Sequence, residues 1–346
     1  MKTIGTEILP ATRVERTKPV ICPEQDAFLF EHELKKNIPP VFAYQFDNVK
    51  IWPNGYLIHP SMRLPLPEGF STPPRGKRWI KNAIKTSLIG MRSRTGIKVQ
   101  EPALFITDEF SNGYFHWIGD VLPRLELLVA TRGIEALRSK RLVVPAMADF
   151  SYVRPSLDPY GLSGTLVLGN QEELLCDDLE VIGPCAPSGN YRPELMQALR
   201  ERFRAWFKVS ARPEKRLFIS RIEAPMRRIA NEAHLKQILD RYGFESVVLE
   251  DLPFAQQVAL IGSASCIVGL HGAGLTNMLW MKEGCSVAEL RFRGDSHNNC
   301  YFSLASDLGL AYQYLLVEKE NPKANVHNAD ALVDPLALEQ LLRNLC

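Results

Sequence analysis

Short apolar runs alternate with longer amphipathic ones throughout the C-terminal part of the chain. The apolar runs begin at residues 216, 245, 265, 286 and 311 and read RLFISR, ESVVLE, SCIVGL, SVAELRF and AYQYLLVE. Between and after them lie segments with helical spacing, among them NEAHLKQILDRYG, PFAQQVALIGSA, NNCYFSLASDLG and DPLALEQLLRNLC. Strands that alternate with helices of this length indicate crossover units on a parallel sheet. We therefore predict a doubly wound α/β domain.

The N-terminal part has a different pattern. Residues 1–100 are rich in proline and in short alternating runs, which predict short strands and turns. From Ala103 the chain reads as a strand, a loop and a helix, followed by strand candidates at 141–146, 165–170 and 178–184 and a long helix at 193–209. The segment ARPEK is the best candidate for a linker. We expect an N-terminal domain over 1–208, with 1–100 strand- and turn-rich and 101–208 α/β, and a C-terminal domain over 209–346.

Composition narrows the class of partner. The 346 residues carry 41 basic and 39 acidic side chains, so the formal net charge is +2, which gives no reason to expect nucleic acid or an anionic membrane as the main partner. The seven cysteines are scattered and never spaced as CxxC, which favours a reducing compartment over a disulfide framework or a zinc site. No apolar run is long enough for a signal peptide or a membrane span, so we expect a soluble, intracellular protein.

Ligands of an open parallel sheet bind outside the carboxyl ends of its strands. In the C-terminal half these ends deliver five arginines and one histidine, which suit an anion such as a diphosphate. The residues concerned are Ser220, Arg221, Arg227, Arg228, His271, Gly272, Ala273, Gly274, Glu289, Arg291 and Arg293.

The stretch HGAG, from His271 to Gly274, has two interpretations. Glycines let backbone N–H groups approach phosphate oxygens at a helix N-terminus, but a single GxG at a strand–helix turn also serves tight packing. The spacing is neither G-x-G-x-x-G after the first strand nor that of a P-loop, which disfavours a nicotinamide dinucleotide and excludes a Walker motif. The chain has no D-x-D pair, so the simplest metal–diphosphate clamp is absent.

The N-terminal half contributes the segment NGYFHWIGDVLPR at 112–124. His116 and Asp120 are spaced i, i+4, so a helix starting near Phe115 would place both on one face. A carboxylate that holds an imidazole makes it a candidate general base. The alternative is that the pair only orients the helix or packs. Asp108 and Glu109, after the preceding strand, are rival carboxylates, and neither G-x-S-x-G nor H-E-x-x-H occurs.

These blocks together resemble the glycosyltransferase 61 family. The resemblance rests on NGYFHWIGDVLPRL, RLFISRIEAPMRRIANEAHL, PFAQQVALIGSASCIVGLHGAGLTNMLW and SVAELRF, which occur in this order within about residues 103–316. It implies a GT-B architecture, with two Rossmann-like domains facing a cleft and extra short strands at the N-terminus. It also implies inverting, metal-independent transfer from a nucleotide sugar. Bacterial members of this kind serve capsular or exopolysaccharide biosynthesis, which implies a cytoplasmic enzyme, peripheral to the inner membrane through its acceptor.

The resemblance also assigns roles to residues. Arg221 would contact the donor diphosphate with Arg227 or Arg228, and Asn231 and Glu232 would order the start of the next helix. Glu289 would bind ribose or anchor its turn. The donor pocket would comprise His271, Gly272, Ala273, Gly274, Leu275 and Asn277. The dipeptide Pro225-Met226 departs from the polar residues that relatives often carry before the arginine pair.

The mechanism expected from these residues is a single in-line displacement at the anomeric carbon of a UDP-sugar. Asp120 or His116 would deprotonate a hydroxyl of a glycan or glycolipid acceptor, with Glu109 as the next candidate. The alternatives are a module of the same fold that binds a nucleotide sugar or a partner without transfer, and a Rossmann-type epimerase or dehydrogenase. The sugar, the acceptor, the linkage and the oligomeric state stay open.

Overall fold

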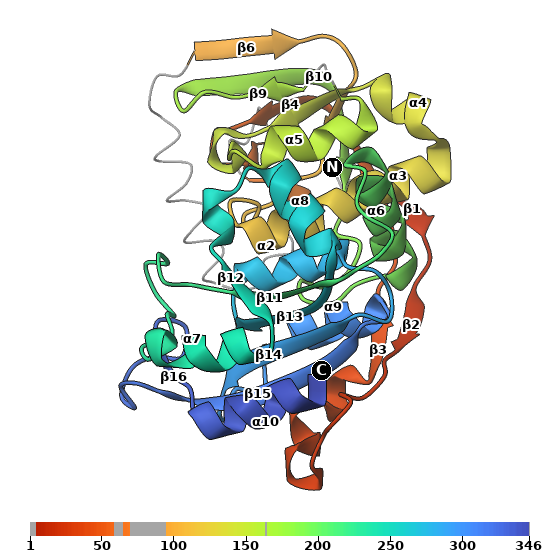
Figure 1. Ribbon diagram of the computed structural model, residues 1–346. Coiled ribbons are helices and arrows are strands. Elements are labelled where there is room, and N and C mark those ends of the chain that lie inside the picture. Colours follow the sequence, from red (N-terminus) through yellow and green to blue (C-terminus); the bar gives the residue numbers. More distant parts are fainter. Residues whose placement is uncertain (1–4, 59–64, 70–94, 163–164, 346) are drawn as a thin grey trace. The chain divides into compact units, whose positions relative to one another are not determined.

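The computed structural model describes residues 5–58, 65–69, 95–162 and 165–345 (Figure 1). The chain divides into two compact units. Unit 1 comprises Met1–Thr12 and Ile38–Ser188, and unit 2 comprises Arg13–Asn37 and Gly189–Cys346. Among the described helices, none is both long and apolar enough to cross a membrane.

Unit 2 is built on a six-stranded sheet in the order β12-β11-β13-β14-β15-β16. The first five strands of this order are mutually parallel, and only β16 is antiparallel to its neighbour. The strands are β11 (Lys215–Ile219), β12 (Phe244–Val247), β13 (Ala264–Leu270), β14 (Ser286–Phe292), β15 (Ala311–Lys319) and β16 (Ala331–Leu332). The doubly wound parallel sheet predicted for this half is confirmed.

The order of the parallel strands places a topological switch point between β11 and β13. From β11 the chain moves outward to β12, then crosses back past β11 to β13 and continues to β14 and β15. Successive crossovers leave in opposite directions at this point, and open α/β sheets bind their ligands at such points, outside the carboxyl ends of the strands. Ser220 and Arg221 follow one of these strands, and His271 and Gly272 follow the other.

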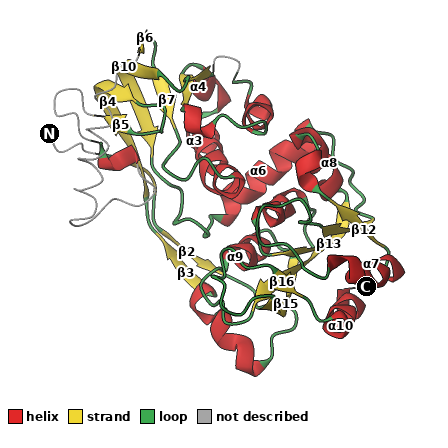
Figure 2. Ribbon diagram, turned by 90° about the vertical axis from the view of Figure 1, so that its left-hand side faces the viewer, coloured by secondary structure: helices red, strands yellow, loops and turns green. Residues whose placement is uncertain are grey.

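Helices cover both faces of the unit 2 sheet, as Figures 1 and 2 show. On one face, α7 and α10 contact each other and share an apolar core with the strands, in which Phe218, Leu235 and Leu342 are buried. On the other face, α6, α8 and α9 surround a 3-10 helix, η8. The helices are α6 (Pro193–Trp206), α7 (Glu232–Arg241), α8 (Phe254–Gly262), η8 (Ala273–Trp280), α9 (Cys300–Asp307) and α10 (Pro335–Leu345).

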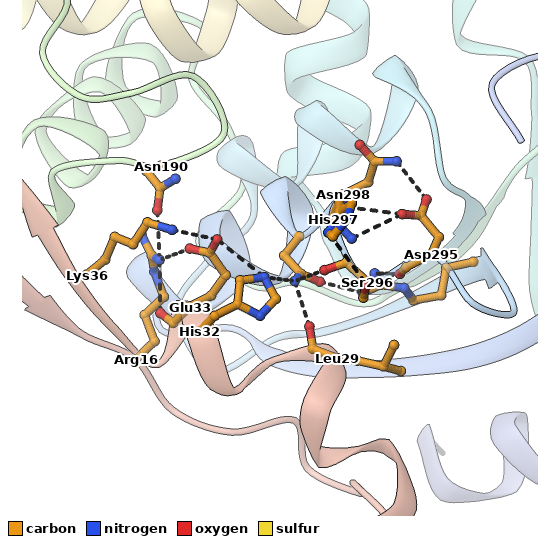
Figure 3. A network of polar contacts seen from close by, with 12 residues as sticks. Arg16, Leu29, His32, Glu33, Lys36, Asn190, Asp295, Ser296, His297 and Asn298 are labelled. Atoms are coloured by element: carbon orange, nitrogen blue, oxygen red, sulfur yellow. Dashed lines mark hydrogen bonds and ion pairs between the residues drawn. The ribbon is translucent and has the colours of Figure 1, made fainter.

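The N-terminal segment Arg13–Asn37 belongs to unit 2 because a buried arginine ties it there (Figure 3). Arg16 donates from Nε and Nη2 to the two carboxylate oxygens of Asp307, at 2.9 and 3.0 Å. Its Nη1 reaches Glu33 and the side-chain oxygen of Asn190, the latter at 3.0 Å. Burying a guanidinium without these acceptors would cost free energy. The segment that carries Arg16 is therefore held next to Asp307 and Asn190. The sequence pattern placed this segment with the N-terminal domain instead.

Helix α6 also lies in unit 2, so the unit boundary falls at Ser188–Gly189 and not at the expected 208–209. Phe203 of this helix stacks on Trp280, with ring centroids 4.8 Å apart, and meets Phe254 edge to face. Arg204 donates to the carbonyls of Gly262 and Trp280 at 2.9 and 2.6 Å. The segment ARPEK therefore joins two elements of one unit and does not link domains.

Unit 1 contains an eight-stranded mixed sheet. Its strands β10, β7, β8 and β9 are neighbours in this order and parallel, whereas β4 runs antiparallel to β10 and carries β1 and β5. The strands are β1 (Thr6–Leu9), β4 (Val41–Ile51), β5 (Leu57–Ile58), β6 (Thr95–Val99), β7 (Ala103–Phe105), β8 (Arg141–Val144), β9 (Leu166–Val167) and β10 (Glu172–Ile182). Two further strands, β2 (Thr12–Glu15) and β3 (Lys35–Ile38), pair with each other at the two ends of the Arg13–Asn37 segment of unit 2.

The parallel part of unit 1 is a Rossmann-like half-sheet. Numbered along the chain, its strand order is 3-2-1-4, so its switch point lies between β7 and β10. The α-helices in the described part of this unit are α2 (Tyr114–His116), α3 (Leu122–Arg132), α4 (Ile134–Arg138) and α5 (Val153–Leu157), with a π-helical turn at Trp117–Val121. The predicted strand–loop–helix sequence from Ala103 is confirmed, as are the strands at 141–146 and 165–170. The strand predicted at 178–184 is also present, but it begins earlier, at Glu172.

Candidate functional site

Arg221 lies at the switch point of unit 2 and is fixed by its own loop. Its Nε donates to the carbonyl of Arg227 at 2.8 Å, and its Nη2 donates to that of Met226 at 3.1 Å. The loop that follows β11 therefore folds back onto the guanidinium of Arg221, which lies at the start of this loop. Two of the arginine's donors are used in this way, and the remaining nitrogen, Nη1, points at Gly272.

The close approach of Arg221 to the backbone requires a glycine at position 272. A Cβ atom built on it would lie 2.5 Å from Nη1 of Arg221 and 3.0 Å from its Cζ, closer than nonbonded atoms pack. The absence of a side chain thus allows the arginine to reach across from β11 to the backbone after β13. The interpretation of the glycine as permitting close approach is supported, although the group that approaches within the structure is a guanidinium.

The surroundings of Arg221 are electropositive. Burial lowers the pKa of Arg221, and the nearby charge of Arg227 lowers it further. Arg227 itself has a left-handed backbone conformation, with φ of 56°, and its buried Nε has no hydrogen-bond partner among the described residues. Two arginines in close electrostatic contact, one with an unsatisfied donor, form a site that an anion would stabilise.

Arg228 has another partner. Its backbone N–H and its Nη2 both bind the carboxylate of Asp330, at 2.8 and 3.1 Å. The expectation grouped Arg227 and Arg228 as alternative phosphate ligands. In the structure they diverge, because the side chains of consecutive residues leave the backbone in different directions, and only Arg227 is in electrostatic contact with Arg221.

A second feature of unit 2 is a buried carboxylate that holds a histidine. One oxygen of Glu289 accepts a hydrogen bond from Nδ1 of His271, and the other accepts from the hydroxyl of Tyr312. Glu289 has no exposed surface, whereas the His271 side chain is 13% exposed. The ring of Tyr301 packs edge-on against His271 at 4.9 Å. His271 is therefore oriented through Nδ1, and its Nε2 is left for other partners.

The charges around Glu289 keep it ionised. Burial alone would raise the pKa of Glu289, but His271, Arg291 and the Tyr312 hydroxyl lower it overall. Conversely, burial alone would lower the pKa of Arg291, and Tyr312 and Glu289 raise it. A fully buried carboxylate with both oxygens occupied offers no acceptor to a ribose hydroxyl. Of the two roles expected for Glu289, the structure thus favours the anchoring one.

The rest of the HGAG segment builds the turn. Leu275 is buried against Gly269, and its N–H donates to the carbonyl of Gly272. Asn277 is buried and binds both the Gly274 carbonyl and the indole nitrogen of Trp280, at 3.1 and 3.0 Å. Ala273 opens η8, and the side chains of Leu275 and Asn277 are buried within it, so they do not line a donor pocket in the way expected.

Asn231 has a different role from the one expected. It precedes α7, but its side chain makes no capping bond. Instead it forms a pair of hydrogen bonds with the backbone of Val333, at 2.7 and 3.1 Å, beside β16. Glu232 accepts from the hydroxyl of Ser220, which fixes the residue before Arg221.

Unit 1 brings together His116, Asp120 and Ser188. His116 Nδ1 lies 2.7 Å from Asp120 Oδ2, and the Ser188 hydroxyl donates to the same oxygen at 2.8 Å. The side chains of His116 and Asp120 are 28% and 9% exposed. No described residue bonds to Nε2 of His116 or to Oδ1 of Asp120. The predicted His116–Asp120 pair is confirmed, and Ser188 is a third member that the sequence did not indicate.

The backbone at this pair is unusual. Asp120 lies in the π-helical turn Trp117–Val121 and not in a regular α-helix. Pro123, just beyond it, lacks the N–H that would bind the carbonyl four residues earlier, so the helical ladder is interrupted there. Turns of this kind occur often at functional sites. Phe110 stacks on the His116 ring at 5.2 Å, which restrains its orientation.

The two rival carboxylates, Asp108 and Glu109, lie in different environments. Asp108 is buried and binds Nη2 of Arg124 at 2.5 Å, and Arg124 also donates to the carbonyl of Ile182 at the end of β10. Asp108 thus joins the two strands of the unit 1 switch point and is not available as a base. Glu109 is half-buried and lies near Tyr56, whose pKa is raised by burial and by this carboxylate.

Metal ligands do not gather in the described parts of the chain. No three histidine, cysteine, aspartate or glutamate side chains within residues 5–58, 65–69, 95–162 and 165–345 lie close enough together to hold an ion. Metal-independent transfer stays a prediction, because only the activity measured with and without metal ions can test it.

The sequence profile of the family described as Glycosyltransferase 61 matches residues 114–288, which is more than half of the chain. The chain belongs to the glycosyltransferase 61 family. The matched range includes the His116–Asp120 pair, Arg221 and the HGAG segment, and it ends one residue before Glu289.

Curated relatives match over shorter segments. The EGF domain-specific O-linked N-acetylglucosamine transferase of Drosophila melanogaster is 30% identical over 136 residues, which are 38% of this chain and 25% of that protein. Protein O-linked-mannose beta-1,4-N-acetylglucosaminyltransferase 2 of Bos taurus is 31% identical over 120 residues, 34% of this chain and 19% of the relative. The human protein of that name matches to the same extent. The matched segments thus span a quarter or less of these relatives.

Three residues of the two sites were not expected from the sequence. Ser188 and Tyr312 bind Asp120 and Glu289, and Tyr301 packs on His271. Tyr312 is opposite Val287 in the β14–β15 register, two residues from Glu289. The contact between Tyr312 and Glu289 could have been predicted only from the strand order together with this register.

Proposed function

We propose that the chain is an inverting glycosyltransferase that moves a sugar from a nucleotide sugar to a hydroxyl group. The observation that carries the proposal is the switch point of unit 2, where Arg221 meets the backbone of Gly272 and Arg227 lies in electrostatic contact with Arg221. This arrangement supplies permanent positive charge and backbone N–H groups for a diphosphate. Family membership supports the same reaction class.

The donor we propose is a UDP-sugar, and the sugar is N-acetylglucosamine. The relatives reported above are named as N-acetylglucosamine transferases, which supports this choice. A hydroxyl of a glycan, glycolipid or glycosylated protein would be the acceptor. A capsular or exopolysaccharide role and a cytoplasmic location stay predictions, and the relatives that match are animal proteins. We also propose the GT-B class, with the parallel sheets of units 1 and 2 as its two Rossmann-like cores.

The reaction would proceed in one displacement. The acceptor oxygen forms a bond to the anomeric carbon while the bond from that carbon to the diphosphate oxygen breaks, and the configuration inverts. Nε2 of His116 takes the acceptor proton, and Asp120 holds the ring through Nδ1 and stabilises the imidazolium that forms. Glu109 remains the next candidate base.

Arg221 and Arg227 would stabilise the leaving diphosphate, whose negative charge grows as the bond breaks. His271, held by Glu289, would donate from Nε2 to a phosphate oxygen or to the donor sugar. Such preorganised donors stabilise developing charge without reorganising during the reaction, and each is worth about 10²–10³ in rate.

A donor screen tests this proposal. Purified protein is incubated with UDP-N-acetylglucosamine and, in parallel, with other UDP-, GDP- and CMP-sugars, and released nucleotide is measured with and without acceptor glycans. We expect release of UDP that depends on acceptor, and a product of inverted anomeric configuration by NMR. Binding of a nucleotide without transfer to any glycan would favour the non-catalytic module. No binding of any nucleotide sugar would refute both.

A further inference from the structure

The outer edge of β15 has an interruption in its hydrogen bonding. Along this strand the odd-numbered residues direct their backbone groups toward β14, as the bonds from Ala311 to Cys285 and from Arg293 to Val317 show. The even-numbered residues therefore face outward. Tyr312 accepts from the N–H of Val20 at 2.9 Å, and Glu318 pairs with Leu332 of β16.

Between these two positions, the outward-facing groups are those of Tyr314 and Leu316. Neither the N–H nor the C=O of either residue forms a hydrogen bond with any part of the chain that the structure describes. Backbone groups of this kind bind strongly and directionally, and an edge strand presents them as a template for another strand. Edges are commonly blunted by lysine, proline or a bulge, but the two residues here are tyrosine and leucine.

A cavity of about 680 Å³ lies along the same edge. Tyr314 and Leu316 line it from the strand, and Ile21 and Leu332 line it from the segments that flank the interruption. The latter two apolar side chains are each 48% exposed. Residues of α10, including Leu341, close one side. All of these residues belong to unit 2, so the groove is formed within a single compact unit.

The pattern of the unpaired groups indicates the chemical class of the ligand. Two donors and two acceptors alternate at the two-residue spacing of a β-strand, and an extended peptide backbone presents the complementary series at the same spacing. A sugar could satisfy one or two of these groups through its hydroxyls, but its donors do not repeat at this interval. The volume lies within the range of ligand pockets, which is about 300–1,000 Å³.

We propose that the edge of β15 between Tyr312 and Glu318 binds an extended segment of a partner polypeptide as an additional strand. The interval measures about 20 Å at roughly 3.3 Å per residue, so it holds about five residues. Their backbone groups pair with Tyr314 and Leu316. Alternate side chains meet Leu341 on the α10 side and Ile21 on the other, so apolar residues are expected at alternate positions. Strand addition of this type is a general mode of peptide recognition.

This proposal does not rest on glycosyl transfer. The groove uses none of the residues assigned to the donor or to the base, and a chain that failed every donor screen would retain the edge. A partner peptide bound there would hold a protein substrate or a protein partner on unit 2.

The first experiment measures amide hydrogen exchange in the full chain by NMR. We expect the amides of Tyr314 and Leu316 to exchange at least about 100-fold faster than those of Leu315 and Val317, whose N–H groups face β14. Equal protection of all four amides in the free protein would overturn the proposal, because the edge would then already be paired.

The second experiment measures binding of fluorescein-labelled heptapeptides that alternate Val, Ile or Tyr with Thr and have Lys or Glu at both ends. Peptides of the same sequences with N-methylated backbone amides serve as controls. We expect a dissociation constant of about 10⁻⁴ M or tighter for at least one peptide, protection of the Tyr314 and Leu316 amides on binding, and affinity at least about tenfold weaker after N-methylation. Equal binding of the methylated peptide, or no binding by any peptide, would overturn the proposal.

A matched pair of variants locates the site. Leu316→Pro removes an N–H that no described residue uses, whereas Leu316→Ala keeps it and changes only the side chain. We expect the proline variant to lose peptide binding at least about tenfold and the alanine variant to retain it within about threefold. Equal loss in both would overturn backbone pairing. If the proline variant fails to fold, the exchange and N-methylation results decide the question.

Discussion

Each unit of this protein holds a histidine beside a carboxylate near the switch point of its sheet, but the two pairs differ in burial. In unit 1 the Asp120 side chain is 9% exposed, and one of its oxygens has no bond to a described residue. In unit 2 Glu289 is fully buried, and both of its oxygens are occupied. The first pair can exchange a proton with a ligand. The second holds its histidine in one orientation.

The difference follows from the elements that carry each pair. His116 and Asp120 lie on one helical segment, four residues apart, so local geometry brings them together. His271 follows the end of β13, whereas Glu289 lies in the middle of the neighbouring parallel strand β14, opposite Gly269, so the carboxylate sits within the sheet. A carboxylate there must remain paired, because an isolated buried charge is costly. Variants at each pair test whether the two have the separate roles proposed.

The largest effect is expected from the unit 1 pair. His116→Gln removes the proposed base, and Asp120→Asn removes the carboxylate that orients and stabilises it. Each should lower kcat by about 10²–10⁴ and leave UDP affinity unchanged. Steady-state rates and calorimetric UDP titration measure the two quantities. Ser188→Ala is the matched control and should cost less than about tenfold, because Asp120 keeps its bond to His116. Near-normal turnover of Asp120→Asn would remove this pair from the mechanism.

The next effect is expected at the arginine of unit 2. Arg221→Ala should lower the transfer rate by about 10²–10³ and weaken UDP binding as well, since the guanidinium binds the donor in both the ground state and the transition state. Arg221→Lys should recover only a small part, because an ammonium cannot replace the guanidinium fork that reaches two carbonyls and the backbone of Gly272 together. An alanine variant that binds UDP like the parent would place the diphosphate elsewhere.

A smaller effect is expected from Glu289→Gln. Loss of the charge that holds His271 should lower kcat/KM by roughly 10–100-fold, in the range seen for residues that orient a functional histidine. Because the pKa of Glu289 is lowered in the folded protein, its carboxylate stabilises the fold above the ordinary glutamate pKa of 4.5. That contribution disappears as the pH falls through the lowered pKa.

As the pH falls below 4.5, the variant should therefore lose less stability than the parent. Thermal denaturation across this range measures the difference, and Tyr312→Phe, which keeps the charge, is the control. Parallel curves for parent and Glu289→Gln would show that the carboxylate is not ionised there.

The smallest effect is expected from Arg228→Ala. This side chain pairs with Asp330 at a half-exposed position, so its loss should change stability by less than about 1 kcal/mol and leave UDP affinity within about twofold. Arg227→Ala, at the adjacent position, should weaken UDP binding clearly. The positive charge of Arg227 lies beside Arg221, and its loss removes part of the attraction for the diphosphate. If the two variants behave alike in a UDP titration, the distinction drawn between these arginines fails.

The parts of the fold that sequence patterns predicted best are those with local causes. Apolar runs separated by helical segments gave the parallel sheet of unit 2, and the i, i+4 spacing gave the His116–Asp120 contact. The unit boundary was misplaced because α6 is held by Phe203 and Arg204 in contacts that are remote in sequence. The Arg13–Asn37 segment was misplaced for the same reason, since the acceptor Asp307 lies 291 residues from Arg16.

The elements of the fold, the family and the charged residues follow from local patterns, because periodicity, glycine spacing and motif order are local properties of the chain. The role of each charged side chain follows from the folded structure. Strand order placed Arg221 against Gly272, register placed Tyr312 and His271 on Glu289, and the loop after Met226 turned Arg228 toward Asp330. The role of an ionisable side chain depends on its burial and on its partners. Both are set by contacts between segments that lie far apart in the sequence.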